Sequence, residues 1–186
     1  MRSLTGSPRM TRLLTTAALA ALIALPAAAQ TVRMGTEGAY PPYNFIDDNG
    51  EVAGFERELG DELCARAELE CVWVTNEWDS IIPNLVGGNY DTIIAGMSIT
   101  PERDEVIDFT QAYKPSESNV FVALAGAGEA ATTGVVAAHV NTIQSGWLAE
   151  QGRTLVEFAT PDETIAAVRN GEADAVFATS PSSARS

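Results

Sequence analysis

Residues 88–103 read Gly-Asn-Tyr-Asp-Thr-Ile-Ile-Ala-Gly-Met-Ser-Ile-Thr-Pro-Glu-Arg. The apolar run 92–95 follows a Gly-Asn turn, which predicts a buried strand of a parallel sheet ending at Gly96. Thr100 and Pro101 have the residue types of a helix N-cap and a first helical position. Strand, small-residue turn and helix start together predict a ligand-binding shelf at the carboxyl end of a parallel strand.

The groups on this shelf suit a small carboxylate. Gly96 has no side chain, so backbone N–H groups are open to a ligand there, and the Ser98 hydroxyl is expected beside them. Arg103, one helical turn later, can supply a bidentate guanidinium. Without these neighbours Arg103 would be interpreted as a surface arginine, but Ser98 and Thr100 favour a ligand-binding role.

Residues 1–29 have the pattern of a secretory signal peptide. Three arginines precede the apolar run 13–25, and an Ala-x-Ala site predicts cleavage after Ala29. A membrane-spanning helix is the alternative, but it needs about 20 apolar residues and this run is shorter. Translation could start at Met1 or at Met10, because either start leaves a basic residue, an apolar run and a cleavage site.

Charge and cysteine content narrow the class of protein. The formal charge of −14 becomes about −17 without the three leader arginines, which argues against nucleic acid or an anionic membrane as a partner. Cys64 and Cys71 are the only cysteines, and an exported chain is oxidised, so we expect a local disulfide between a helix and a strand. Two free buried thiols are the alternative. The single His139 has no cysteine neighbour, so no metal site is predicted.

The first half of the chain predicts alternating strands and helices. Residues 31–36 form a strand that ends before Glu37, and a proline-stiffened loop then carries Tyr40, which is expected at a pocket wall. Helix 56–67 is expected to bury Leu59, Leu63 and Ala67 and to leave its acidic side chains, among them Glu56, in solvent. Strand 71–75 precedes Trp78, and Asp79 is the expected N-cap of helix 80–86.

The second half repeats this pattern after an extended crossing segment, 119–125. Strand 134–138 is followed by a helix over 142–150 with Ile143, Trp147 and Leu148 inward, and by strand 155–158. Residues 160–163 form a capping box, their helix ends at residues 170–171, and strand 173–178 follows. Residues 82–95 and 165–178 align without a gap, which indicates one unit used twice. The predicted division is lobe 1 (30–118), hinge strand (119–125), lobe 2 (126–178) and an irregular tail (179–186).

Several motifs resemble the family-3 periplasmic solute-binding proteins, the amino-acid receptors of ABC importers. They are Gly-Phe-Glu-x-Glu-Leu (54–59), the cysteine pair, Trp-Asp-x-Ile-Ile-Pro-x-Leu (78–85), Tyr-Asp-x-Ile-Ile-Ala-Gly-Met-Ser-Ile-Thr-x-x-Arg (90–103) and Ile-Asp-Phe-Thr (107–110). The lysine/arginine/ornithine and histidine receptors are similar down to the cysteines. The resemblance implies an α/β fold of type II with two lobes, parallel sheets flanked by helices, and an incomplete second lobe.

The resemblance also implies a site and a role. Arg103, Ser98, Gly96 and the Thr142 backbone would hold a ligand carboxylate, Tyr40 and Trp78 would enclose the ligand side chain, and Glu37 would meet its distal positive charge. Three ligand-site positions depart from those receptors: Ala95 and Gly96 replace hydroxyl residues, and Thr179 replaces an aspartate. The implied protein is a periplasmic monomer without a cofactor or catalytic residues, and it passes a polar or basic L-amino acid to a membrane permease.

Two other functions remain open. Some proteins that resemble this family are periplasmic dehydratases of cyclohexadienyl acids, and Glu37 and His139 are the residues here that could act as acid or base. The polar stretch 179–186 lacks periodicity and stands where family members continue the second lobe. A truncated, non-functional receptor fragment is therefore the other alternative.

Overall fold

The computed structural model describes residues 30–180. The predicted signal peptide, 1–29, and residues 181–186 of the predicted tail lie outside the described residues. Between residues 30 and 180, every helix is too short or too polar to cross a membrane.

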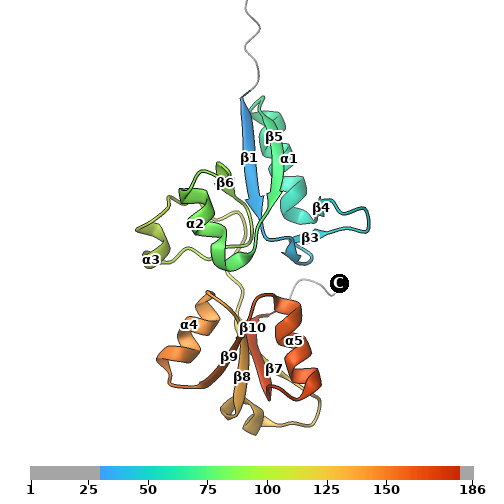
Figure 1. The fold of residues 1–186 in the computed structure, drawn as a ribbon, viewed down its shortest axis with the longest axis vertical. Coiled ribbons are helices and arrows are strands. Elements are labelled where there is room, and N and C mark those ends of the chain that lie inside the picture. Colours follow the sequence, from blue (N-terminus) through green and yellow to red (C-terminus); the bar gives the residue numbers. More distant parts are fainter. Residues whose placement is uncertain (1–29, 181–186) are drawn as a thin grey trace, which may run out of the picture. The chain divides into compact units, whose positions relative to one another are not determined.

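The first sheet is parallel, with strand order β5-β1-β6 (Figure 1). Its strands are β1 (Thr31–Thr36), β5 (Glu70–Thr75) and the short β6 (Thr92–Ile93), and they pair as Thr36 with Thr75 and Gly35 with Ile93. Strand alternation directs Met34 toward α1 (Phe55–Arg66), while Val74 and Ile93 pack with Ile81 of α2 (Ile81–Val86). The sheet is therefore covered on both faces, as a parallel sheet requires.

The predicted disulfide is present. Cys64 lies in the last part of α1 and Cys71 in β5, and their sulfur atoms are bonded. Cys64 also packs against Met34 of β1, so the bond links the helix to the sheet inside the core.

The expected burial of α1 is wrong for two of its three residues, since only Leu59 packs against the core. Leu63 is 53% exposed and Ala67 is also exposed, whereas Glu56, Gly60 and Cys64 are the buried residues of the helix. Glu56 is fully buried because the Asn44 amide and the Tyr113 hydroxyl both donate to its carboxylate. These partners are distant in sequence, so the acidic pattern of the helix gave no sign of them.

A small antiparallel sheet, which was not predicted, holds the loop that follows β1. It consists of β2 (Ala39–Tyr40), β3 (Asn44–Ile46) and β4 (Val52–Ala53), in that order. Tyr40 pairs with Asn44, and the side-chain amide oxygen of Asn44 accepts from Gly38 N–H at 2.7 Å. Tyr40 is thus placed by a strand pair.

The second sheet has strand order β7-β10-β8-β9. It contains β7 (Asn119–Ala123), β8 (Val135–His139), β9 (Thr154–Phe158) and β10 (Ala175–Thr179), and a 3-10 turn (Glu129–Thr133) precedes β8. β10, β8 and β9 are parallel to one another, whereas β7 runs antiparallel to β10, with Asn119 opposite Thr179. β10 thus includes Thr179, and the Ser180 N–H donates to Ser118 O.

Two helices cover opposite faces of this sheet (Figure 1). Val136 and Ala138 pack with Leu148 of α4 (Ile143–Glu150), and the intervening Ala137 packs with Ala167 of α5 (Pro161–Asn170). Leu148 is fully buried, as expected. Ile143 and Trp147 are more than a third exposed, yet the Trp147 ring contacts Phe121 and the buried Phe177, so the prediction is correct for one face of this ring.

The helix starts follow their caps closely. Thr100 accepts from Arg103 N–H at the start of α3 (Pro101–Asp104), and capping boxes open α4 at Thr142 and α5 at Thr160. The expected cap at Asp79 is wrong: residues 78–80 form a 3-10 turn, and Ser80 precedes α2 without a side-chain capping bond.

Candidate functional site

All nine residues predicted to contact a ligand line one cavity. It opens to solvent, and about 690 Å³ of non-atom space, part of it open solvent, lies between its walls. The predicted residues in its lining are Glu37, Tyr40, Trp78, Ala95, Gly96, Ser98, Arg103, Thr142 and Thr179. The structure thus brings together residues that are up to 142 positions apart in sequence.

The ends of strands place most of these residues. Glu37 follows β1, Trp78 lies just after β5, and Gly96 lies just after β6. In the second sheet, His139 is the last residue of β8 and Thr179 the last of β10. Ligands of α/β proteins bind at the carboxyl ends of parallel strands because loops and helix starts converge there.

Arg103 is held by two backbone carbonyl groups. Its Nη1 donates to Ser98 O at 2.8 Å and its Nη2 to Asn141 O at 3.0 Å. The guanidinium carbon lies 5.5 Å from the centre of the Trp78 ring, within the range of a cation–π contact. Burial lowers the pKa of Arg103, but a guanidinium titrates so far above neutral pH that it stays charged. The pocket therefore contains an oriented positive charge.

Two of the other donors assigned to a carboxylate have internal partners. Gly96 N–H donates to the Tyr113 hydroxyl at 3.1 Å, and Thr142 N–H donates to Ser145 Oγ at 3.2 Å. An incoming carboxylate would have to replace or share these bonds. Thr179 Oγ1 accepts from Gln144 Nε2 at 3.0 Å.

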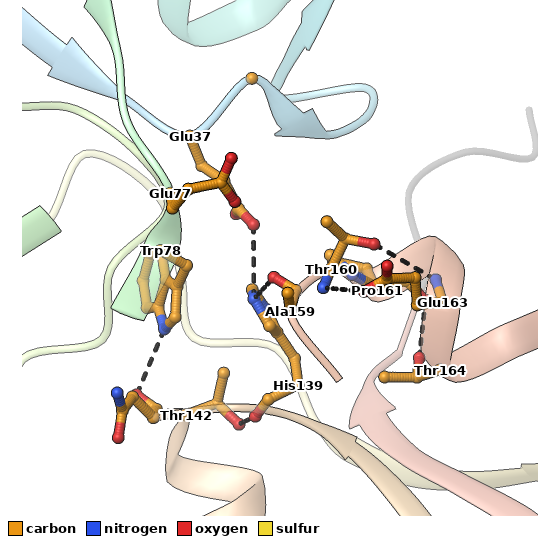
Figure 2. A network of polar contacts seen from close by, with 12 residues as sticks. Glu37, Glu77, Trp78, His139, Thr142, Ala159, Thr160, Pro161, Glu163 and Thr164 are labelled. Carbon is orange, nitrogen blue, oxygen red and sulfur yellow. Dashed lines mark hydrogen bonds and ion pairs between the residues drawn. The ribbon is translucent and has the colours of Figure 1, made fainter. Parts of the chain in front are cut away.

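A buried acid and an imidazole face each other on another wall (Figure 2). Glu37 Oε1 lies 3.4 Å from His139 Nε2, and their side chains are only 6% and 12% exposed. Within residues 30–180, Glu37 Oε1 is buried without a hydrogen-bond partner. Burial, and then the charge of Glu77, raises the pKa of Glu37 to about 7. Burial lowers the pKa of His139.

Sequence reasoning missed part of the lining. His139 was considered only as a catalytic alternative, although it directly follows the predicted strand 134–138, as Glu37 follows the first strand. Gln144 and Thr164 lie in the first turns of α4 and α5. Their place in the cavity lining depends on how these helices approach the cavity. Asn141 contributes through its backbone carbonyl, which accepts from Trp78 and Arg103. The residue type alone could not indicate this contribution.

The described residues contain no group of three or more His, Cys, Asp or Glu side chains that could hold a metal ion. The cavity is lined by a guanidinium, a buried carboxyl–imidazole pair and aromatic side chains. This combination suits a zwitterion with a second polar or charged end.

Comparison with known proteins identifies relatives of one family. Bacterial extracellular solute-binding proteins, family 3, match over residues 32–145. The octopine-binding periplasmic protein of Rhizobium meliloti is 48% identical over 94 residues, which is 50% of this chain and 32% of that protein.

Solved structures are similar over more of the chain. The crystal structure of a periplasmic His/Glu/Gln/Arg/opine family-binding protein from Silicibacter pomeroyi in complex with lysine has 74% identity and a TM-score of 0.76, covering 80% of this chain and 67% of that one. The ancestral amino acid-binding protein AncCDT-1, a precursor of cyclohexadienyl dehydratase, has 30% identity and a TM-score of 0.75, with coverages of 81% and 71%. The chain thus spans about a third of the octopine relative and about two thirds of these structures. It belongs to the family 3 bacterial extracellular solute-binding proteins.

Proposed function

We propose that this chain is the periplasmic substrate-binding component of an ABC importer and captures a polar or basic L-amino acid, with a cationic side chain preferred. The observation that carries the proposal is one cavity lined by both the Arg103 guanidinium and the buried Glu37 carboxylate. An amino acid with a cationic side chain has a carboxylate for the first group and a positive charge for the second. Tyr40 and Trp78 supply apolar faces for the carbon chain between them.

The names of similar proteins support the same ligand class. One relative is named for octopine binding, and a 74%-identical structure holds lysine. Both names describe cationic or opine ligands of periplasmic proteins. The proposal includes delivery of the ligand to a membrane permease, because this is the step that such a binding protein would serve.

The test is ligand binding by the purified chain, measured by thermal shift and calorimetry. Lysine, arginine, ornithine, octopine and glutamine form the ligand panel. Arg103→Ala should weaken lysine binding about 10- to 100-fold, because charged hydrogen bonds to the carboxylate are lost. Arg103→Lys should be intermediate, since an ammonium keeps the charge but cannot bind the carboxylate in bidentate fashion.

Arg169→Ala is the matched control, because Arg169 is an exposed arginine near the end of α5 and is absent from the cavity lining. It should bind lysine as the parent protein does. A chain that unfolds cooperatively but binds no member of the panel would contradict the proposal. Equal losses in the Arg103→Ala and Arg169→Ala variants would contradict the role of Arg103.

A second candidate function is dehydration of a cyclohexadienyl acid. The carboxyl–imidazole pair favours it, because the pKa of Glu37, about 7, suits a group that transfers protons near neutral pH. AncCDT-1 is described as an amino-acid-binding precursor of such an enzyme. Product formation from prephenate or arogenate, absent in Glu37→Gln, would support this function over simple binding.

A further inference from the structure

The Glu37–His139 pair has a geometry that ligand capture alone does not explain. His139 Nε2 lies 2.9 Å from Ala159 O and 3.4 Å from Glu37 Oε1 (Figure 2). A carbonyl oxygen only accepts, so Nε2 carries a hydrogen and donates it to Ala159 O. The backbone of His139 is fixed as well, because the Thr142 hydroxyl donates to His139 O at 2.7 Å. The imidazole is therefore fixed beside the carboxyl group, with Nδ1 as the nitrogen that can gain a proton.

The surroundings of this pair are acidic. Glu77 and Asp79 approach from the segment after β5, and Glu163 approaches from the start of α5. Arg103 of α3 and Tyr40 of β2 line the same cavity. An ionised Glu37 with a neutral His139 would leave a buried, uncompensated negative charge near other acids, which is unfavourable. One proton held by either member makes the pair neutral overall.

We propose that Glu37 and His139 form a proton-exchanging pair that gives up one proton when a cationic ligand side chain enters the cavity. The inference rests on the proposed capture of a cationic amino acid. The ligand charge then replaces the proton as the partner of the carboxylate, so capture of lysine is coupled to proton release. A neutral ligand such as glutamine brings no replacing charge and leaves the proton in place.

The direction of the pH effect follows from this exchange. Burial raises the pKa of Glu37 to about 7 and lowers the pKa of His139, so the carboxyl group competes with the imidazole for a proton near neutral pH. Below about pH 7 the pair holds its proton, and lysine must displace it, so the apparent affinity for lysine falls by up to tenfold per pH unit. Above pH 7 the proton is already absent, and the affinity for lysine becomes independent of pH.

The experiment is calorimetry of lysine and glutamine binding at pH 6 and pH 8, in phosphate and in imidazole buffer. These buffers differ in protonation enthalpy, so the difference in apparent binding enthalpy counts the protons released. Lysine should release close to one proton at pH 6 and close to none at pH 8, while glutamine should release close to none at either. Lysine binding at pH 6 without proton release would overturn the inference and leave the proposed function standing. Absence of binding by both amino acids would overturn both.

Three variants test the two members of the pair and the charge beside them. Glu37→Gln should abolish proton release and weaken lysine binding more than glutamine binding. His139→Gln retains an N–H donor for Ala159 O but removes one of the two sites that can hold the proton, so the pair binds the proton less tightly and the midpoint of the pH dependence should fall. Glu77→Gln removes the neighbouring charge that raises the pKa of Glu37, so the midpoint should fall. An unchanged midpoint in His139→Gln would show that the carboxyl group acts alone and would overturn the pair.

Discussion

Asn141 has a backbone conformation that few residue types adopt. Its φ of 55° lies in the left-handed region, where a side chain other than that of Gly, Asn or Asp costs about 1–2 kcal/mol. In this conformation its carbonyl oxygen accepts from Trp78 Nε1 at 3.2 Å and from Arg103 Nη2 at 3.0 Å. One backbone carbonyl therefore positions two side chains of the cavity wall.

This geometry predicts different lysine affinities for two substitutions of the exposed Asn141. Asn141→Gly keeps the left-handed conformation accessible and should leave lysine affinity within about twofold. Asn141→Val strongly disfavours it, turns the carbonyl away from Arg103 and Trp78, and should weaken lysine binding about tenfold. Calorimetric Kd values for the two variants check this prediction. Both variants lack the amide side chain, so equal affinities would mean that the backbone conformation of Asn141 has no role.

At the scale of elements, two helices contain an interior glycine in different surroundings. A Cβ at Gly60 of α1 would lie 2.6 Å from Cζ2 of Trp73, whereas a Cβ at Gly146 of α4 would meet no atom within 4 Å. Neither glycine has a positive φ. The same substitution should therefore have opposite effects in the two helices.

We predict that Gly60→Ala lowers the free energy of unfolding by about 1–3 kcal/mol, because the added methyl group overpacks α1 against β5. Gly146→Ala should raise it by about 0.5–1 kcal/mol, because alanine stabilises a helix interior relative to glycine. Urea unfolding of both variants against the parent chain measures the two changes. Changes of the same sign would show that the contact between Gly60 and Trp73 does not limit packing.

The sequence predicted most helices and strands correctly, but it predicted less well which of their side chains are buried. Thr100, Thr142 and Thr160 marked helix starts correctly, because capping depends on neighbouring residues only. Glu56 was expected in solvent, yet it is buried by partners 12 and 57 positions away. Local periodicity cannot show such partners.

At the scale of the whole molecule, the disulfide predicts a loss of stability without a loss of binding. Cys64 and Cys71 are seven positions apart and are absent from the cavity lining. Reduction should lower the free energy of unfolding by about 2.5 kcal/mol, because the unfolded chain gains conformational freedom. Lysine affinity should be unchanged wherever the protein remains folded.

Urea unfolding with and without dithiothreitol tests this prediction. A Cys64→Ala/Cys71→Ala double variant is the control, and dithiothreitol should not affect its unfolding. A reduced chain that stays folded but binds lysine more weakly would contradict the separation between disulfide and cavity.

The candidate site was predictable to the extent that its residues follow strand ends. Glu37, Trp78 and Gly96 each follow a predicted strand, and all three line the cavity. The internal partners of the predicted groups were not predictable, because the bond from Gly96 to Tyr113 and that from Arg103 to Asn141 join distant segments. Sequence patterns indicated which residues gather at the site, and the tertiary fold determined their hydrogen bonds.

Trp78 gives the cavity wall an intrinsic fluorophore. The chain has three tryptophans; Trp78 is almost fully buried in the cavity wall, while Trp73 donates to Asp61 Oδ1 at 3.0 Å and Trp147 is more than a third exposed. With phenylalanine at positions 73 and 147, the remaining indole fluorescence would come from the wall of the cavity alone. On the proposed function, such a chain would be a dye-free sensor whose emission reports occupancy by its amino acid.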